Sequence, residues 1–417
     1  MEKDSKFYKE KRIEEVLNNL LEKIIKNPDL NPPINSKKDF ISDFNERCSK
    51  LNECIQKFAD DAKNKNKAIG FEKLIEKSQK IQICINETLN NYLAGDIKSA
   101  YDTFDNTFSN QSIISHLHRI CVPLNQLSDK TTPLFRVRKS DQPLKERDDI
   151  FHIPFSKRHL VNAQRYSVAG LPCLYLGTSL YVCWLEMNKP DFDKLYISSF
   201  KAKDVSSKIL NLASKHMILP KNTNDDENTI VDTNRTIASY LIFWPLIIAC
   251  NYIRQNPDSS FIQEYIIPNI LMQWIGRKTS SSIIGVAYFS TKMPNTRSSL
   301  RSVNIVLPPK VTYDQTIKFK YCPKLSNLFN FTNPLSWQVL KTLEYPDPAI
   351  KNVEQARAKT YLTSITKNNK IKEIDDDLVV LYPLTDFYKL EICINDLFDH
   401  QTINNDITDG GKLAAEP

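Results

Sequence analysis

The spacing of apolar residues over the first 130 residues constrains the fold of this chain more than any other feature. Apolar side chains recur every three or four positions at 13–25, 41–58 and 71–81, which is the spacing of one face of an amphipathic helix. Pro28 follows the first run and is typical of a helix end. The sequence therefore predicts a helical unit over residues 1–130, whose apolar stripes form its core and carry no catalytic spacing.

The pattern changes near Pro133 and becomes a mixture of helical and strand-like segments. Short strand-like runs of apolar or alternating residues lie at 134–138, 172–176, 283–289 and 302–306. Between them, residues 180–187 read as a helix capped by Thr178 or Ser179, because a hydroxyl at that position accepts a hydrogen bond from the first turn. We therefore expect an α+β fold.

This pattern divides the rest of the chain into three parts. A compact domain is predicted over residues 131–320, followed by a C-terminal extension over residues 321–403 with further short segments. The polar tail over residues 404–417 is expected to be disordered.

The composition limits the classes of function. With 41% hydrophobic and 25% charged residues, the chain has the make-up of a globular protein. Its net charge of +7 leaves two interpretations open, a basic surface that binds nucleic acid or a polyanionic nucleotide, and ordinary solvated surface. No basic run is dense enough to decide, and no recognition module with interleaved basic and aromatic residues is visible.

Cysteine usage and hydropathy indicate the compartment. The nine cysteines form no CxxC pair and no Cys/His cluster with zinc spacing, so we expect buried free thiols in a reducing environment and no metal. The N-terminus is highly charged and has no apolar signal core, and the most apolar stretch, 237–250, is too short to span a bilayer. A cytoplasmic protein without membrane contact is the prediction.

Arg165 and Tyr175 are the first candidates for a site. Arg165 precedes a glycine turn and a strand, where a planar, permanently charged guanidinium can bind a pyrophosphate. A surface ion pair is the alternative, and this residue alone favours it. Tyr175 lies between two leucines of a short strand and so points to the opposite face. It either lines a cleft and stacks on a planar ring or is half-buried core.

Glu186 and Ser290 add a carboxylate and a hydroxyl. Glu186 lies in an otherwise apolar helical stretch, where a carboxylate is costly to bury unless it is paired or used; an exposed position on an amphipathic helix is the alternative. Its use would be to stabilise positive charge at a sugar carbon whose bond to nitrogen breaks. Ser290 follows a strand but has no Gly-x-Ser-x-Gly elbow, and His152 and His159 lack partners and are interpreted as structural.

The order and spacing of these residues carry more information than each residue alone. The segment RYSVAGLPCLYLGTSLYVCWLEM, from Arg165 to Met187, resembles the core of the RES domain family, named for its Arg, Glu and Ser. That core reads Arg-aromatic, Gly-x-Pro-x-Leu-Tyr-Leu, a small residue or Ser, then Glu. Further matches in the same order are Leu134–Arg138, Phe151–Arg158, Glu264–Pro268, Gly285–Ser290 and Asn304–Val306. The resemblance covers roughly residues 133–310.

The resemblance implies a fold, a reaction and a set of roles. It implies a compact domain like that of ADP-ribosyltransferase toxins, which are commonly the toxin half of toxin–antitoxin or defence systems and deplete NAD⁺. Arg165 would hold phosphate, Tyr175 would stack on or orient nicotinamide, Glu186 would stabilise the oxocarbenium-like transition state, and Ser290 would position the substrate. The further substrate-binding residues predicted from it are Arg136, Arg158, Tyr166 and Tyr288.

The predicted activity is therefore that of an NAD⁺ glycohydrolase, with NAD⁺ as substrate and no cofactor. The alternatives are an ADP-ribosyltransferase acting on a protein or nucleic acid, and a non-enzymatic nucleic-acid-binding protein. The helical N-terminal unit and the C-terminal extension depart from compact family members, and two roles stay open for them: holding the enzyme inactive, or docking a sensor in place of a small antitoxin. The predicted partners are NAD⁺, an antitoxin or sensor protein, and a second copy of the chain in a homo-oligomer.

Overall fold

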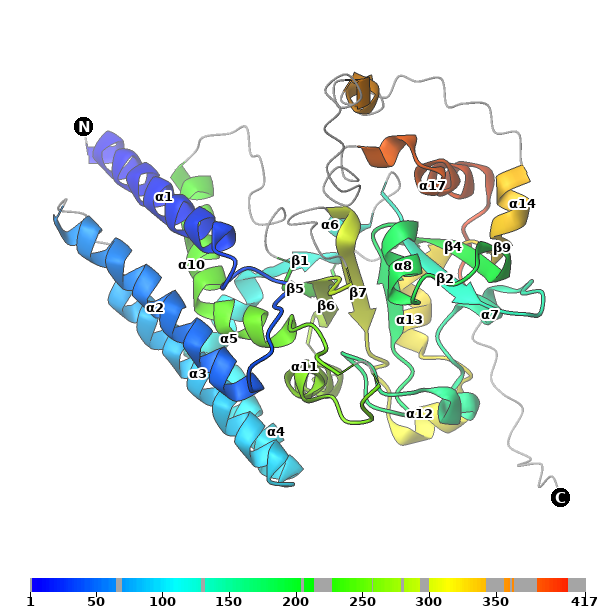
Figure 1. Ribbon diagram of the computed structural model, residues 1–417, viewed down its shortest axis with the longest axis horizontal. Helices are drawn as coiled ribbons and strands as arrows, with labels where there is room; N and C mark the ends of the chain where they lie inside the picture. The colour runs from blue at the N-terminus through cyan, green and yellow to red at the C-terminus, as the bar shows by residue number, and fades with distance from the viewer. Residues whose placement is uncertain are drawn as a thin grey trace. The chain divides into compact units, whose positions relative to one another are not determined.

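The computed structural model consists of two compact units, each built from separate stretches of the chain (Figure 1). One unit comprises Met1–Val122 and Leu210–Trp274, and the other comprises Pro123–Ile209 and Ile275–Pro417. The residues that the structure describes are 2–64, 70–128, 132–203, 206–213, 227–256, 258–278, 281–292, 300–342, 356–360, 362–363 and 381–403. The predicted α+β class with N-terminal helices is confirmed.

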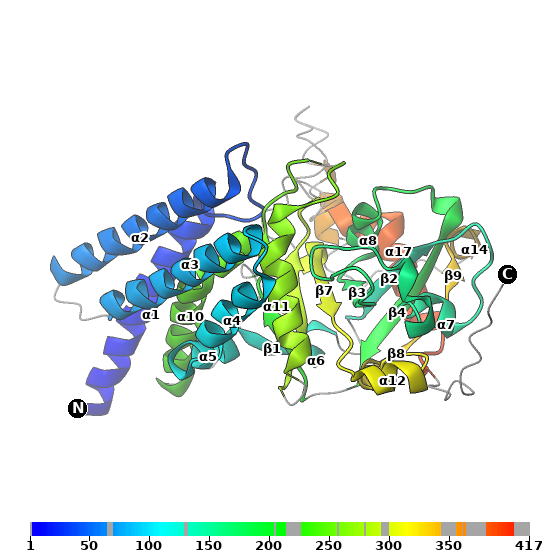
Figure 2. The ribbon, with the colours of Figure 1, turned by 90° about the horizontal axis from the view of Figure 1, so that it is seen from below.

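The first unit is helical. Its helices are α1 (Glu2–Lys26), α2 (Phe40–Asn64), α3 (Phe71–Leu93), α4 (Ile97–Phe108), α5 (Gln111–Arg119) and α10 (Glu227–Cys250), followed by η3 (Gln263–Tyr265) and α11 (Ile266–Arg277). Figure 2 shows α2 and α3 running alongside each other, and α3 also packs against α4 and α10. The side chains of Asp96 and Asn110 cap α4 and α5 by accepting backbone hydrogen bonds from Ser99 and Ser112.

The apolar stretch at 237–250 forms most of α10, and every residue from Tyr240 to Cys250 is buried. This helix packs against α1 and α3, and the indole Nε1 of Trp244 donates to the carbonyl of Leu30 at 2.9 Å.

The sequence predicts residues 210–274 inside the domain at 131–320, whereas the structure groups them with the N-terminal helices. Among the described residues, no helix has the length and hydrophobicity needed to cross a membrane.

The second unit is built on an antiparallel sheet. Its strands are β2 (Leu134–Lys139), β3 (Leu174–Gly177), β4 (Leu195–Ala202), β6 (Ile283–Phe289), β7 (Val303–Leu307), β8 (Phe329–Phe331) and β9 (Leu335–Ser336). They are arranged in the order β6-β7-β3-β2-β4-β8, with β9 also paired to β4. Two short strands, β1 (Cys121–Pro123) and β5 (Lys208–Asn211), lie where the chain passes from one unit to the other.

Short helices surround this sheet. They are α6 (Leu124–Leu127), α7 (Arg147–Ile150), η1 (Phe155–Leu160), α8 (Leu180–Glu186), η2 (Phe192–Lys194), η4 (Leu300–Ser302), α12 (Tyr313–Lys318), α13 (Pro323–Leu328), α14 (Trp337–Thr342), η5 (Tyr382–Leu384) and α17 (Asp386–Leu397). The hydroxyl of Ser179 caps α8 by accepting from the Val182 N–H at 3.1 Å, so of the two predicted caps Ser179 is the one used.

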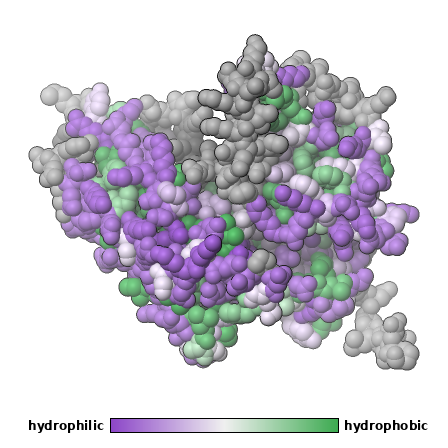
Figure 3. All heavy atoms as spheres, in the orientation of Figure 1, coloured by the Kyte–Doolittle hydropathy of each residue, from purple (hydrophilic) through white to green (hydrophobic). Residues whose placement is uncertain are grey.

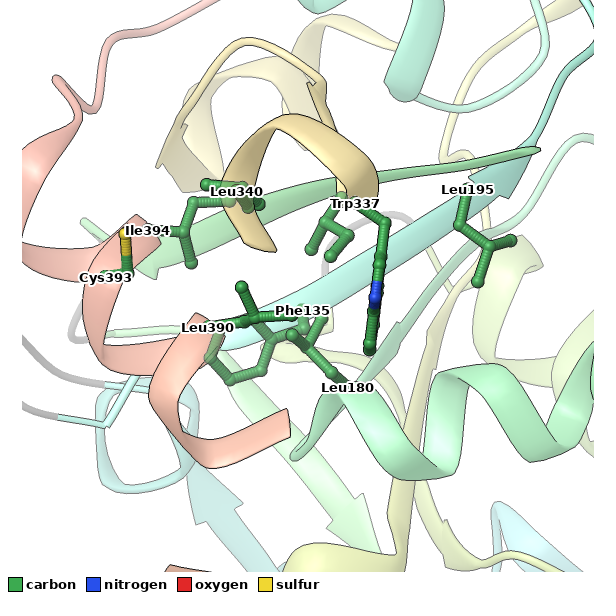
Figure 4. Close-up of a cluster of buried hydrophobic side chains, with 9 residues drawn as sticks. Phe135, Leu180, Leu195, Trp337, Leu340, Leu390, Cys393 and Ile394 are labelled. Carbon is green, nitrogen blue, oxygen red and sulfur yellow. The ribbon is translucent and has the colours of Figure 1, made fainter. Parts of the chain in front are cut away.

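Described residues beyond 320 belong to the core of this unit. The strands β8 and β9 pair with β4, and helices α14 and α17 pack on the same strand. Figure 4 shows the resulting cluster, in which Trp337 and Leu390 meet Phe135 and Leu180. The boundary that the sequence predicted at residue 320 therefore falls inside a packed sheet, while the predicted disordered tail at 404–417 lies outside the described residues.

Two glycines set close contacts in this sheet. A Cβ at Gly285 of β6 would lie 2.3 Å from the carbonyl oxygen of Val306 on β7. A Cβ at Gly177, the last residue of β3, would lie 2.6 Å from the sulfur of Cys183 and 2.7 Å from a methyl carbon of Val182. All three distances are shorter than van der Waals contact, so glycine at 177 lets α8 lie directly on β3.

The outer face of the molecule seen in Figure 3 is dominated by hydrophilic side chains, with apolar residues in small separate patches. This distribution is the one expected if most charged side chains form solvated surface.

Candidate active site

Glu186 is the last residue of α8, and the backbone beyond it turns sharply. Asn188 and Lys189 both have positive φ angles, 63° and 53°, which end the helix directly after the acid. The Glu186 side chain is half-buried. It is therefore neither a solvated helix residue nor a fully enclosed charge.

Two buried side chains hold one oxygen of the Glu186 carboxylate. The hydroxyl of Ser290, which follows β6, donates to Oε1 at 2.7 Å, and the amide Nδ2 of Asn304 on β7 donates to the same oxygen at 2.7 Å. Ser290 and Asn304 are 2% and 5% exposed, so both donors are shielded from water. No described residue hydrogen-bonds to Oε2. The structure thus brings the predicted Glu186 and Ser290 together, and the second carboxylate oxygen accepts no hydrogen bond from the part of the chain that the structure describes.

The segment Ser290-Thr291-Lys292 connects Glu186 with Arg165. Thr291 accepts a hydrogen bond of 3.1 Å from Nη2 of Arg165, which is buried, so an exposed surface ion pair does not describe this arginine. The Lys292 ammonium donates to the backbone carbonyl of Glu186 at 3.1 Å and to the side-chain oxygen of Asn188. These three successive residues therefore contact both Arg165 and Glu186.

Tyr175 has the alternation predicted for it. Leu174 and Leu176 are buried, and Tyr175 between them is half-buried on the opposite face. Its hydroxyl is 3.0 Å from the hydroxyl of the buried Ser167, which fixes the outer end of the ring. A partly exposed ring held at its hydroxyl is suited to stacking on a planar group.

Arg136 supports Tyr175 from the neighbouring strand β2. Its Nη1 donates to the carbonyl oxygen of Tyr175 at 2.9 Å. Burial, together with the nearby charge of Arg138, lowers the pKa of Arg136 to about 10, so it is still protonated at neutral pH. The structure gives this residue a contact with the backbone of the site; the pyrophosphate contact predicted for it stays a prediction.

Tyr166 and Tyr288 contact each other. Their ring centroids are 4.5 Å apart at 42°, and the side chains are 0% and 4% exposed. Such burial favours a packing role beneath the site over the direct substrate contact that the sequence predicts.

Arg158 lies on η1 with an exposed side chain, and its Nε donates to the carbonyl of Phe155 at 3.2 Å within the same turn. None of its described hydrogen bonds joins it to Glu186, Arg165 or Tyr175. The described residues therefore do not place Arg158 with the other predicted site residues.

Comparison with known proteins adds one relative. The chain is 32% identical over 262 residues to a protein of Bacillus subtilis (strain 168) named "Putative toxin YopC". The match covers 62% of this chain and 58% of that protein. No family model and no solved structure matches the chain. The resemblance to the RES domain and the ADP-ribosyltransferase-like architecture therefore stay predictions.

Sequence reasoning did not select Asn304 as a site residue. It is the single polar residue in the buried strand Val303–Leu307. A buried amide in an apolar strand is costly unless it is hydrogen-bonded, so its position alone could have marked it as a partner of another buried polar group.

The two histidines near the site carry no catalytic arrangement. His152 is buried, and its Nε2 accepts from the Cys322 N–H at 2.9 Å while Nδ1 donates to the carbonyl of Ile153 at 2.8 Å. Burial lowers the pKa of His152 to about 4, which keeps the ring neutral. His159 is exposed.

Proposed function

We propose that this chain is a toxin-type enzyme that cleaves the bond between nicotinamide and ribose in NAD⁺, with water as the acceptor. The observation that carries the proposal is the Glu186 carboxylate, whose Oε1 is held at 2.7 Å by both Ser290 and Asn304 while no described residue binds Oε2. A fixed carboxylate in a partly shielded site stabilises a developing positive charge without having to reorganise during the reaction.

The reaction that fits this arrangement is a heterolytic cleavage. The electron pair of the ribose C1–nitrogen bond leaves with nicotinamide, which becomes neutral, and the resulting oxocarbenium-like cation faces Glu186. Water adds to C1 and loses a proton to solvent, so NAD⁺ and water give ADP-ribose, nicotinamide and a proton. In this proposal Arg165 binds a phosphate and Tyr175 stacks on nicotinamide.

The toxin part of the proposal is supported by the relative named "Putative toxin YopC". A toxin of this kind acting inside the cell that makes it requires restraint, so an antitoxin that covers the site belongs to the same proposal.

The test is an assay of purified protein with NAD⁺, in which nicotinamide and ADP-ribose are both quantified. Glu186→Ala should lower the rate of nicotinamide release by about 10²- to 10³-fold or more. Glu186→Gln should do the same while keeping the hydrogen bonds of Ser290 and Asn304, and Glu22→Ala, at an exposed position on α1, should leave the rate unchanged. Wild type and Glu186→Ala proteins that release nicotinamide alike would overturn the proposal.

The same assay separates the two alternatives. Label from adenine-labelled NAD⁺ that stays on a protein or nucleic acid, in place of free ADP-ribose, would indicate transfer. Absence of NAD⁺ turnover together with a strongly salt-dependent affinity for DNA or RNA would indicate a nucleic-acid-binding protein.

A further inference from the structure

Asn304 occupies an unusual place in the sheet. It lies in β7, directly opposite Gly177 of β3 and Tyr288 of β6, and the other residues of its strand are apolar and buried. The cost of burying an amide there is offset by its hydrogen bond of 2.7 Å to Oε1 of Glu186.

The register explains how Glu186 reaches this amide. Residues directly opposite in an antiparallel pair project to the same face of a sheet, so Asn304 and the missing side chain of Gly177 share a face. On that face, Val182 and Cys183 of α8 lie within 2.7 Å of the point where a Cβ of Gly177 would be. The glycine therefore lets α8 lie close to the sheet, and the amide beside it meets the acid at the end of that helix.

The two donors to Oε1 differ in rigidity. The Ser290 hydroxyl rotates about its C–O bond and also accepts from the backbone N–H of Lys292 at 3.2 Å, in a segment just outside β6. The Asn304 amide is planar, 5% exposed and carried by a strand paired on both sides. Of the two, it is the one whose direction is set by the sheet.

We propose that Asn304 is the positioning residue of this site, a fixed amide that orients the Glu186 carboxylate so that Oε2 faces the reacting sugar carbon. The inference rests on the proposed function, because it assigns Asn304 a role through Glu186. Loss of the amide leaves the acid in place but misdirected, which lowers kcat while substrate binding through Arg165 and Tyr175 persists.

The decisive variant is Asn304→Asp, which keeps the size of the side chain and replaces the donor by a second carboxyl. Above neutral pH the two carboxylates repel each other, so kcat should fall by about 100-fold with KM within about twofold of the wild-type value. At pH 5 two carboxyls in contact hold one proton between them, and the protonated oxygen can donate to Glu186 as the amide does. The ratio of variant to wild-type kcat should therefore rise as the pH falls.

Two companions and one control complete the experiment. Asn304→Ala should lose kcat to a similar extent with no recovery at pH 5, because no proton can restore the donor. Asn110→Asp, which makes the same change of charge at the exposed cap of α5, should match wild type at every pH. If Asn304→Asp melts below the assay temperature, Asn304→Ser, which keeps a donor in a smaller side chain, takes its place, and a reduced kcat at unchanged KM is then expected.

The outcomes separate the inference from the proposed function. If Glu186→Ala is inactive but the Asn304 variants have wild-type kcat, or if Asn304→Asp loses the same fraction of kcat at every pH as Asn304→Ala does, Asn304 has a structural role and the inference fails alone. If the wild-type protein releases no nicotinamide, the proposed function fails and the inference with it.

Discussion

Glu391, on the C-terminal helix α17, accepts a hydrogen bond of 2.7 Å from the backbone N–H of Leu180, the first residue of α8. The Tyr382 hydroxyl donates to the same carboxylate oxygen, and Nη1 of Arg301 lies 3.8 Å from the other. Helix α8 thus has Glu391 at its beginning and Glu186 at its end. The part of the chain interpreted as an extension holds the helix that carries the proposed catalytic acid.

The buried Glu391 makes stability depend on pH. Burial raises the pKa of this carboxyl from its ordinary value of 4.5 to about 7, against the opposing effects of Tyr382, Leu180 and Arg301. Because the folded protein binds the proton more tightly than the unfolded chain, this group's contribution to the free energy of unfolding is fully present below pH 4.5 and is lost as the pH rises to about 7. Glu391→Gln should remove this slope.

The measurement is urea unfolding of wild type and Glu391→Gln between pH 4.5 and 8. The difference between the two proteins separates the titration of Glu391 from that of His116, His152 and His400, whose pKa values are lowered by full or partial burial. Glu22→Gln, at an exposed site, serves as the control. Parallel curves for wild type and Glu391→Gln would show that Glu391 titrates in the folded protein as it does in the unfolded chain.

Substitution of Thr291 should change KM for NAD⁺ more than it changes kcat. Thr291→Val keeps the volume of the side chain but removes the acceptor for Nη2 of Arg165. If Arg165 binds phosphate, its loss of orientation should raise KM for NAD⁺ by up to about tenfold with a smaller change in kcat, since one hydrogen bond contributes about 1 kcal/mol. Steady-state kinetics measure both, with Thr360→Val, an exposed helix position, as the control. A change confined to kcat would contradict the role given to Arg165.

Trp337 tests whether described residues beyond 320 are part of the folded unit that carries Glu186. Its ring is 3% exposed and packs with Phe135, Leu180 and Leu390 in the cluster of Figure 4. Trp337→Ala should lower the free energy of unfolding by about 3–5 kcal/mol, the range for removal of a large core side chain. Val339→Ala, an exposed position on the same helix, should change it by less than about 0.5 kcal/mol. Equal effects of the two substitutions, measured by denaturant unfolding, would place Trp337 outside the core.

The local sequence pattern predicted the helix and strands of the site well, because each of them shows the hydrophobic spacing or the capping residue typical of its type of element. The strands at 134–138 and 283–289 are hydrophobic enough to be recognised, and α8 has its hydroxyl cap at Ser179. A carboxylate in an apolar helix requires partners, so Glu186 was recognisable as a special residue. The sequence did not identify these partners, because Ser290 and Asn304 are more than 100 residues away from Glu186. They contact it only through the pairing of β3, β6 and β7.

The grouping of elements into units could not be read from the sequence. An apolar helix such as α10 has the same pattern whether it packs on the N-terminal helices or on the sheet. The strands β8 and β9 have three and two residues, too few to show an alternation. An arginine near a motif looks alike in the sequence whether it faces a site or solvent, so the sequence could not show that the Arg158 side chain is exposed.

Gly285 should link the packing of the sheet to the geometry of the site. A Cβ at this position would lie 2.3 Å from the Val306 carbonyl oxygen, so Gly285→Ala must push β6 and β7 apart. The same two strands carry Asn304 and lead into Ser290, and the shift would lengthen both hydrogen bonds to Glu186. We expect a loss of about 1–3 kcal/mol in unfolding free energy and, in protein that is still folded, a lower kcat for NAD⁺ cleavage. Gly70→Ala, where a Cβ meets no atom within 4 Å, is the matched control, and a Gly285→Ala protein with wild-type stability and kcat would show that the strands do not need this close contact.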